Sequence, residues 1–262
     1  MLMHESPTVI ATITPSGNTV VERTTIAMLR DMAEVAPIFS RLSVHGSVDR
    51  FPDEYDEAGM LKAARLLSHA APASIVWNGS KGGAIGLRHD VALAYRITAQ
   101  TGIAADTAGL ALRRAMAARG FRRIGLVTPY TARYVARLAD GFAAEGWEVV
   151  AESHLGMTDN LSYATVPFAR IGEQAREVAA ARPDVLLAWC TNYPAAPLAA
   201  KVEAATGIPF WDATALGLLG ALEAAGIAAR PGATWGSLMA QAAATDAEER
   251  GAANTSPMPT GA

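Results

Sequence analysis

The chain lacks most of the features that mark an extracellular, membrane or nucleic-acid-binding protein. It has one cysteine among 262 residues, which excludes an internal disulfide and is typical of a reducing cytoplasm. No apolar run approaches the roughly 20 residues that span a bilayer, and the start of the chain lacks the basic and then apolar pattern of a secretory signal. The net charge is −3, and no dense stripe of Lys and Arg indicates nucleic acid. We therefore predict a cytoplasmic protein whose partner is a small molecule.

The sequence also lacks the usual motifs for metals and phosphates. Its five histidines show no metal-ligand spacing, and among them His45, which follows a predicted strand, is expected nearest to a site. Three glycines surround Lys81, but their spacing matches neither a P-loop nor a dinucleotide fingerprint. Lys81 instead suits the neutralisation of a substrate carboxylate.

Short β-rich runs alternate with longer stretches that are rich in Ala and Leu. We predict strands at residues 8–13, 38–45, 74–77, 123–127, 148–152 and 185–189. We predict helices at residues 19–33, 55–70, 90–101, 107–118, 131–145, 171–181, 197–206 and 213–224, several of them ended by glycine. This alternation predicts an α/β fold with mostly parallel sheets.

Three segments of the first half recur in the second half. ATITP at 11–15 matches GLVTP at 125–129, SIVWNGS at 74–80 matches LLAWCTN at 186–192, and TGI at 101–103 matches TGI at 206–208. The long and nearly constant offset predicts duplicated α/β units rather than a short-repeat solenoid. We expect two pseudo-symmetric Rossmann-like lobes, one of residues 1–118 completed by a helix at 213–226 and one of residues 119–212. Residues 242–262 are expected to form a weakly ordered tail.

The second match places Cys190 where the first copy has Asn78. Both residues follow a predicted strand, and open parallel sheets bind ligands at the carboxyl ends of their strands. Ser16 and Asn18 follow the first strand, and Tyr130 follows the strand that corresponds to it. We therefore expect these side chains to converge on one cleft between the lobes, with a single reactive thiol.

Four segments resemble a known family. TPSGNTVVE at 14–22, VTPY at 127–130, GMTDN at 156–160 and AWCTN at 188–192 are together similar to the aspartate/glutamate racemase superfamily, in the branch of maleate cis-trans isomerases and arylmalonate decarboxylases. The resemblance implies an enzyme with no cofactor and no metal, in which two cysteines flank a small carboxylate or dicarboxylate. Cys190 matches the second cysteine, whereas the first falls at Asn78, or at Gly79 if the loop is shifted by one.

The missing first cysteine narrows what the resemblance implies. A neutral amide cannot exchange protons, so the two-base chemistry of a racemase is not expected. Arylmalonate decarboxylases are similar to this chain in keeping only the second cysteine. The implied activity is therefore decarboxylation of a substituted malonate or related small diacid, in which Cys190 protonates an enediolate. Candidates for holding the remaining carboxylate are Gly79, Ser80, Tyr130, Thr191 and the backbone of Cys190, and further substrate contacts are assigned to Ser16, Asn18, Asn78, Asn160 and Asn192.

Two other functions stay open at this point. The first is an isomerase or racemase of a small dicarboxylate or amino-acid derivative, in which Cys190 works with an unrecognised second group. The second is a non-catalytic carboxylate-binding protein. A decarboxylase needs a protonated thiol, whereas a covalent isomerase needs a thiolate. A helix-like stretch after Cys190 favours the thiolate, but the prolines at 194 and 197 disturb the local geometry, so the sequence does not decide between the two. A homo-oligomer is compatible with each reading.

Overall fold

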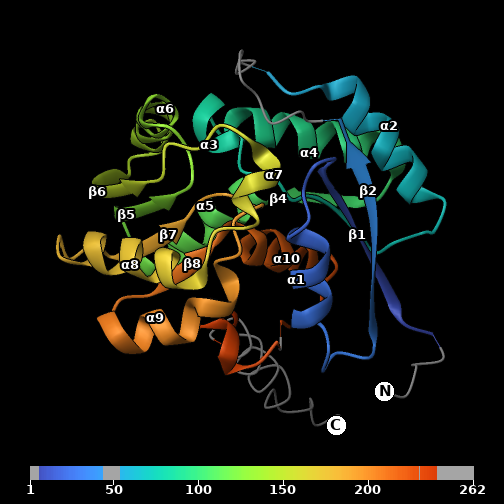
Figure 1. Cartoon of the computed structure of the whole chain (residues 1–262). Coiled ribbons are helices and arrows are strands. Elements are labelled where there is room, and N and C mark those ends of the chain that lie inside the picture. Colours follow the sequence, from blue (N-terminus) through green and yellow to red (C-terminus); the bar gives the residue numbers. More distant parts are fainter. Residues whose placement is uncertain (1–5, 44–53, 230, 241–262) are drawn as a thin grey trace, which may run out of the picture.

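The computed structural model describes residues 6–43, 54–229 and 231–240, and its strands form two four-stranded parallel sheets (Figure 1). The first sheet has the order β2-β1-β3-β4 and the second has the order β6-β5-β7-β8, so both follow the same topology. This confirms the predicted α/β fold with duplicated parallel sheets. The strands are β1 (Thr8–Pro15), β2 (Val35–Leu42), β3 (Ser74–Trp77), β4 (Ala104–Thr107), β5 (Arg123–Thr128), β6 (Glu148–His154), β7 (Val185–Ala188) and β8 (Phe210–Asp212).

Helices cover both sheets. Those between β1 and β5 are α1 (Val21–Met28), α2 (Glu57–Ser68), α3 (Gly82–Ile85), α4 (Arg88–Thr101) and α5 (Ala108–Arg119). Those after β5 are α6 (Ala132–Ala143), α7 (Asn160–Tyr163), α8 (Phe168–Ala179), the 3-10 turn η1 (Ala196–Leu198), α9 (Ala199–Thr206), α10 (Ala213–Ala224) and the 3-10 turn η2 (Ala233–Trp235).

Helix α10 connects the two sheets. It follows β8 of the second sheet but packs on β3 and β4 of the first sheet and on α5. This packing agrees with a first lobe that is completed by the last helix, although the lobe boundary near residue 118 stays a prediction. Figure 1 shows α10 in the interior of the molecule, and its residues from Ala213 to Leu222 are all buried.

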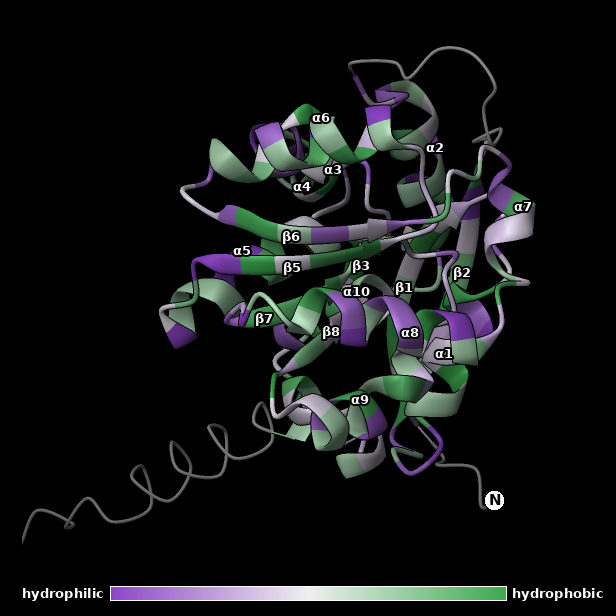
Figure 2. Ribbon diagram, turned by 60° about the vertical axis from the view of Figure 1, so that its left-hand side comes forward, coloured by the Kyte–Doolittle hydropathy of each residue, from purple (hydrophilic) through white to green (hydrophobic). Residues whose placement is uncertain are grey.

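The inner strands β3 and β7 lie in the hydrophobic core. All four residues of β3 and of β7 are buried, and Figure 2 shows hydrophobic strands beneath helices such as α8 whose outer surfaces are hydrophilic. Burial on both faces is typical of parallel strands that are covered by crossover helices. Within the described parts of the chain, no helix has the length and hydropathy to cross a membrane.

The two strands that the sequence prediction omits are β4 and β8, which have four and three residues. Such short runs are too brief to show a strand periodicity. They begin shortly after Gly102 and Gly207, which end α4 and α9 in the left-handed conformation with φ of 72° and 70°, as predicted for helix stops. The predicted tail at 242–262 and His45 lie outside the described residues.

Candidate active site

The sheet register fixes how the two halves correspond at the ends of β3 and β7. The Asn78 N–H donates to the carbonyl of Ile13 at 3.0 Å, and the Trp189 N–H donates to the carbonyl of Val127 at 3.2 Å. Ile13 and Val127 hold matching places in the repeat, directly before Thr-Pro. Asn78 therefore corresponds to Trp189.

One residue further along, Gly79 corresponds to Cys190. The pairing of Asn78 with Cys190 in the sequence alignment is thus wrong by one residue, and the shifted alternative holds. A Cβ atom on Gly79 would lie 2.2 Å from Cζ2 of Trp77, so the indole ring occupies the space of a side chain at this position. The position that corresponds to the thiol therefore carries no side chain.

Asn78 is directed toward α10. Its Nδ2 donates to the carbonyl of Thr214 at 3.1 Å, and a Cβ on Gly217 would lie 2.2 Å from its Cγ. Its Oδ1 is buried and has no hydrogen-bond partner among the residues described. The amide thus ties the end of β3 to the first turn of α10, and a substrate contact of Asn78 stays a prediction.

Cys190 lies just beyond β7 and exposes 2% of its surface. Burial raises the pKa of its thiol to about 12, although hydrogen bonds from the Tyr130 hydroxyl and the Asn192 backbone N–H partly oppose this rise in pKa. Helix α9 begins only at Ala199, so the thiol does not lie at the start of this helix. The thiol is therefore protonated at neutral pH.

Ser80 and Tyr130 join the two sheets beside this thiol. The Ser80 Oγ lies 2.9 Å from the Tyr130 hydroxyl oxygen, and the indole N–H of Trp189 donates to the Ser80 carbonyl at 2.8 Å. Burial raises the pKa of Tyr130 well above its ordinary value. The phenol therefore stays protonated and is able to donate a hydrogen bond.

Asn18 serves two structural purposes. Its Oδ1 accepts the backbone N–H groups of Val20 and Val21 at 2.9 Å each, as a residue that caps a helix start does. Its Nδ2 donates to the Thr191 hydroxyl oxygen at 3.1 Å. Asn18 thus links the loop after β1 to the loop after β7.

Asn192 holds the neighbouring segment. Its Oδ1 accepts the Thr19 N–H at 2.9 Å, and its Nδ2 donates to the Asn160 carbonyl at 2.5 Å. The Nδ2 of Asn160 is buried without a hydrogen-bond partner in the described chain, close to Gly17. A substrate contact of Asn160 stays a prediction.

Two residues that we expected near the site have other contacts. Ser16 is exposed, and its carbonyl accepts Nη1 of Arg41 at 2.8 Å. The Nζ of Lys81 donates to the carbonyl of Glu54 and lies 5.7 Å from the centre of the Tyr55 ring. These contacts give no support to a role of Lys81 beside the thiol.

Two further tyrosines, Tyr134 and Tyr163, pack against Tyr130 and were not among the predicted site residues. The ring centre of Tyr130 lies 4.4 Å from that of Tyr134 and 5.4 Å from that of Tyr163, both edge to face. Burial and the nearby Cys190 raise the pKa of both added phenols. The spacing of four residues between Tyr130 and Tyr134 was the only sequence signal of this cluster.

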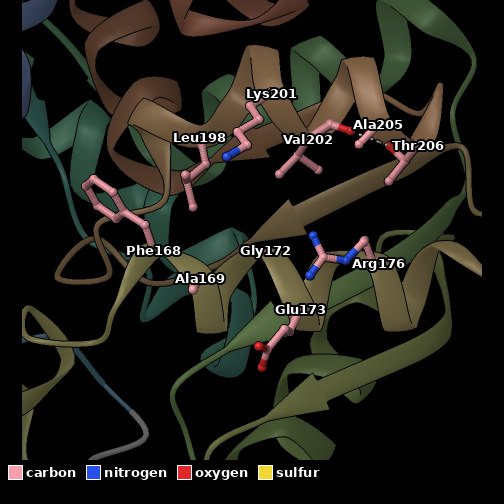
Figure 3. A pocket seen from close by; sticks show the side chains of 10 residues that line it. All are labelled: Phe168, Ala169, Gly172, Glu173, Arg176, Leu198, Lys201, Val202, Ala205 and Thr206. Carbon is pink, nitrogen blue, oxygen red and sulfur yellow. Dashed lines mark hydrogen bonds between the residues drawn. The ribbon is translucent and has the colours of Figure 1, made fainter.

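Six residues of the candidate site are buried. Asn78, Ser80, Tyr130, Cys190, Thr191 and Asn192 each expose at most 9% of their surface. Figure 3 shows a surface pocket between α8 and α9, lined in part by Phe168, Arg176 and Lys201, but none of the predicted site residues lines it. In the described part of the chain, no three His, Cys, Asp or Glu side chains are grouped to hold a metal ion.

The chain is similar to several known proteins. The model of the arylmalonate decarboxylase family matches residues 54–239, and no curated protein matches the chain. Maleate isomerase from Pseudomonas putida S16 is similar in structure, with a TM-score of 0.82, 22% identity, and coverage of 90% of this chain and 100% of that chain. These values establish a shared fold.

Two further structures extend the comparison. A maleate cis-trans isomerase from Nocardia farcinica, in a variant with a covalently bound succinylcysteine intermediate, has a TM-score of 0.79 and 22% identity, and the match covers 90% of this chain and 99% of that chain. Unliganded arylmalonate decarboxylase has a TM-score of 0.74 and 24% identity, and the match covers 90% of this chain and 100% of that chain.

Proposed function

Because the chain belongs to the arylmalonate decarboxylase family, we propose that it is a cofactor-independent decarboxylase of a substituted malonate or a related small diacid. Its relatives of known structure include both a decarboxylase and maleate isomerases. The choice between these reactions therefore rests on the chemistry of the site.

In the proposed reaction, the bond between the α-carbon and one carboxylate breaks, and carbon dioxide leaves without the bonding electron pair. The pair is delocalised onto the remaining carboxylate, which becomes an enediolate. The Cys190 S–H then donates its proton to the α-carbon, and the thiolate regains a proton from water. Since one thiol delivers the proton from one side, a substrate with two different substituents gives one enantiomer.

The observation that carries the proposal is the single protonated thiol. Burial raises the pKa of Cys190 to about 12, which keeps the thiol in the acid form. The corresponding residue in the first half is Gly79, which can neither accept nor donate a proton through a side chain. One acid with no opposing base suits protonation after decarboxylation and not the two-base inversion of a racemase.

The hydrogen-bond donors around the thiol support the same reaction. The Ser80 and Tyr130 hydroxyls, 2.9 Å apart, and the backbone N–H groups of Gly79, Cys190 and Thr191 would hold the remaining carboxylate. Donors that are fixed before the reaction stabilise an enediolate as its charge develops. Asn160, whose Nδ2 has no partner among the described residues, would add a donor on the other side of the site.

A second candidate function is the isomerisation of maleate or a similar diacid. The Tyr130 hydroxyl and the Asn192 N–H both lower the pKa of the Cys190 thiol, in the direction of the thiolate that a covalent reaction needs. Burial outweighs both contributions, which is why we place decarboxylation first.

Proton NMR in deuterated water tests the proposal. The protein and its Cys190→Ala variant are incubated with phenylmalonate, methylphenylmalonate, maleate and small amino diacids. We expect loss of one carboxylate and one deuterium at the α-carbon of the product, and neither change with the variant.

Other outcomes of this experiment would contradict the proposal. Conversion of maleate to fumarate, or α-deuterium exchange without loss of mass, would establish the isomerase or racemase. If the same ligands raise the melting temperature but no substrate changes, the chain is a carboxylate-binding protein.

A further inference from the structure

Thr214, the second residue of α10, is completely buried, and each of its polar groups has a hydrogen-bond partner. Its N–H donates to Oδ1 of Asp212 at 2.8 Å, and its carbonyl accepts Nδ2 of Asn78 at 3.1 Å. Its hydroxyl donates to the carbonyl of Thr191 at 3.1 Å. The orientation of Thr214 is therefore fixed by two bonds, and the third bond reaches the loop that carries Cys190.

The third bond acts on one particular peptide unit. The carbonyl of Thr191 and the N–H of Asn192 belong to the same planar peptide group. That N–H, as a hydrogen-bond donor near the sulfur, lowers the pKa of the Cys190 thiol. A hydrogen bond that fixes the carbonyl end therefore also fixes the direction of the N–H end, and it polarises the amide as a donor.

The other groups of the loop are held by different residues. The Thr191 hydroxyl accepts from Asn18, and the Asn192 side chain contacts Thr19 and Asn160. These bonds restrain side chains, whereas the Thr214 hydroxyl bonds the backbone carbonyl of the loop. The Thr214 hydroxyl can therefore be removed without removing the hydrogen bonds that Asn18 and Asn192 make.

From this geometry we infer that Thr214 is a positioning residue, which orients the peptide between Thr191 and Asn192 so that its N–H meets the Cys190 sulfur. Asn78 holds Thr214 in place from the first sheet. The effect on the sulfur is independent of the reaction, whereas the effect on turnover rests on the proposed decarboxylation.

Infrared spectroscopy of the S–H stretch measures the environment of this sulfur directly. The chain contains one cysteine, so the protein gives a single S–H band. We compare the wild type with Thr214→Val, which keeps the shape and removes the hydroxyl, and with Thr214→Ser, which keeps the hydroxyl. Thr25→Val is the matched control, because the Thr25 hydroxyl is buried and has no hydrogen-bond partner among the described residues.

We expect Thr214→Val to shift the S–H band, and Thr214→Ser and Thr25→Val to leave it at the wild-type position. With phenylmalonate, Thr214→Val should lower kcat about tenfold with little change in KM, because a small misplacement of an acid slows the chemical step. Thr214→Ser should restore kcat.

An unshifted band in folded Thr214→Val overturns the inference, as does an equal shift in Thr25→Val. Should Thr214→Val fail to fold, Asn78→Ala removes the bond to the Thr214 carbonyl instead and should shift the band in the same direction by less. An unchanged band in that variant then overturns the inference. If no malonate is turned over, the proposed function fails while the band still tests the role of Thr214.

Discussion

The ends of β3 and β7 occupy equivalent places in two sheets of the same topology, yet they carry different chemistry. After β7 the chain presents a buried thiol, whereas after β3 it presents Gly79 and the Ser80 hydroxyl. The indole N–H of Trp189, next to the thiol, donates to the Ser80 carbonyl and joins the two ends, and the Ser80 hydroxyl also lies in hydrogen-bond contact with the Tyr130 hydroxyl after β5. In the proposed reaction, the end of β7 would supply the acid, and Gly79 and Ser80 at the end of β3 would supply donors for the remaining carboxylate.

The strongest test of this division replaces each group in turn. Cys190→Ala removes the acid, so we expect kcat for phenylmalonate to fall by about a thousandfold, within the range for general acids, with KM nearly unchanged. Ser80→Ala removes a carboxylate donor, so it should raise KM as well as lower kcat. Steady-state kinetics of carbon dioxide release distinguish the two patterns.

Cys190→Ser is the control for shape in this test. A serine hydroxyl is a much weaker acid than a thiol, so this variant should remain nearly as inactive as Cys190→Ala. Substantial activity in either Cys190 variant would show that another group protonates the intermediate.

The bond between Ser80, after β3, and Tyr130, after β5, allows a second test of how the two sheets cooperate. Tyr130→Phe and Ser80→Ala should each lower kcat/KM by about tenfold to a hundredfold, because each removes a donor and leaves its partner incompletely bonded. The double variant should lose little more than either single variant, since interacting residues are not additive. Tyr95→Phe, at a tyrosine that is 74% exposed, is the control, and full additivity of the two site changes would contradict the coupling.

Close packing beside β3 gives a third prediction. A Cβ on Gly217 would lie 2.2 Å from Cγ of Asn78, so Gly217→Ala should destabilise the fold by about 1–3 kcal/mol, as overpacking does. Gly172→Ala, in helix α8, meets only the flexible Arg176 side chain at 3.8 Å and should stabilise the protein by about 0.5–1 kcal/mol. Urea denaturation measures both changes.

The double variant Asn78→Ala with Gly217→Ala should recover part of the lost stability, because the shortened side chain leaves room for the new methyl group. If the double variant recovers no stability, the destabilisation by Gly217→Ala does not come from a clash with the Asn78 side chain.

Contacts between neighbouring residues in the chain are readable from the sequence, whereas contacts between distant residues are not. The apolar runs of β1, β3 and β7 predicted the sheets, and the motif around Cys190 predicted the family. The register at the end of β3 was ambiguous by one residue, because Trp77 and Trp189 suggested an alignment that the sheet pairing does not follow. Thr214 gave no signal, since its partners Thr191 and Asn78 lie 23 and 136 residues away in the chain.

The last prediction concerns the pH dependence of stability at the thiol end. Burial raises the pKa of folded Cys190 to about 12, whereas the unfolded thiol titrates near about 8.5. Above about pH 8.5 the unfolded chain therefore releases a proton that the folded chain retains, so the free energy of unfolding falls as pH rises toward the folded pKa. The serine hydroxyl of Cys190→Ser does not titrate in this range. Between pH 8 and pH 10 this variant should therefore lose about 1–2 kcal/mol less stability than the wild type in urea titrations. Equal losses in the two proteins would mean that the folded thiol titrates normally, and the acid role that distinguishes the end of β7 from the end of β3 would lose its physical basis.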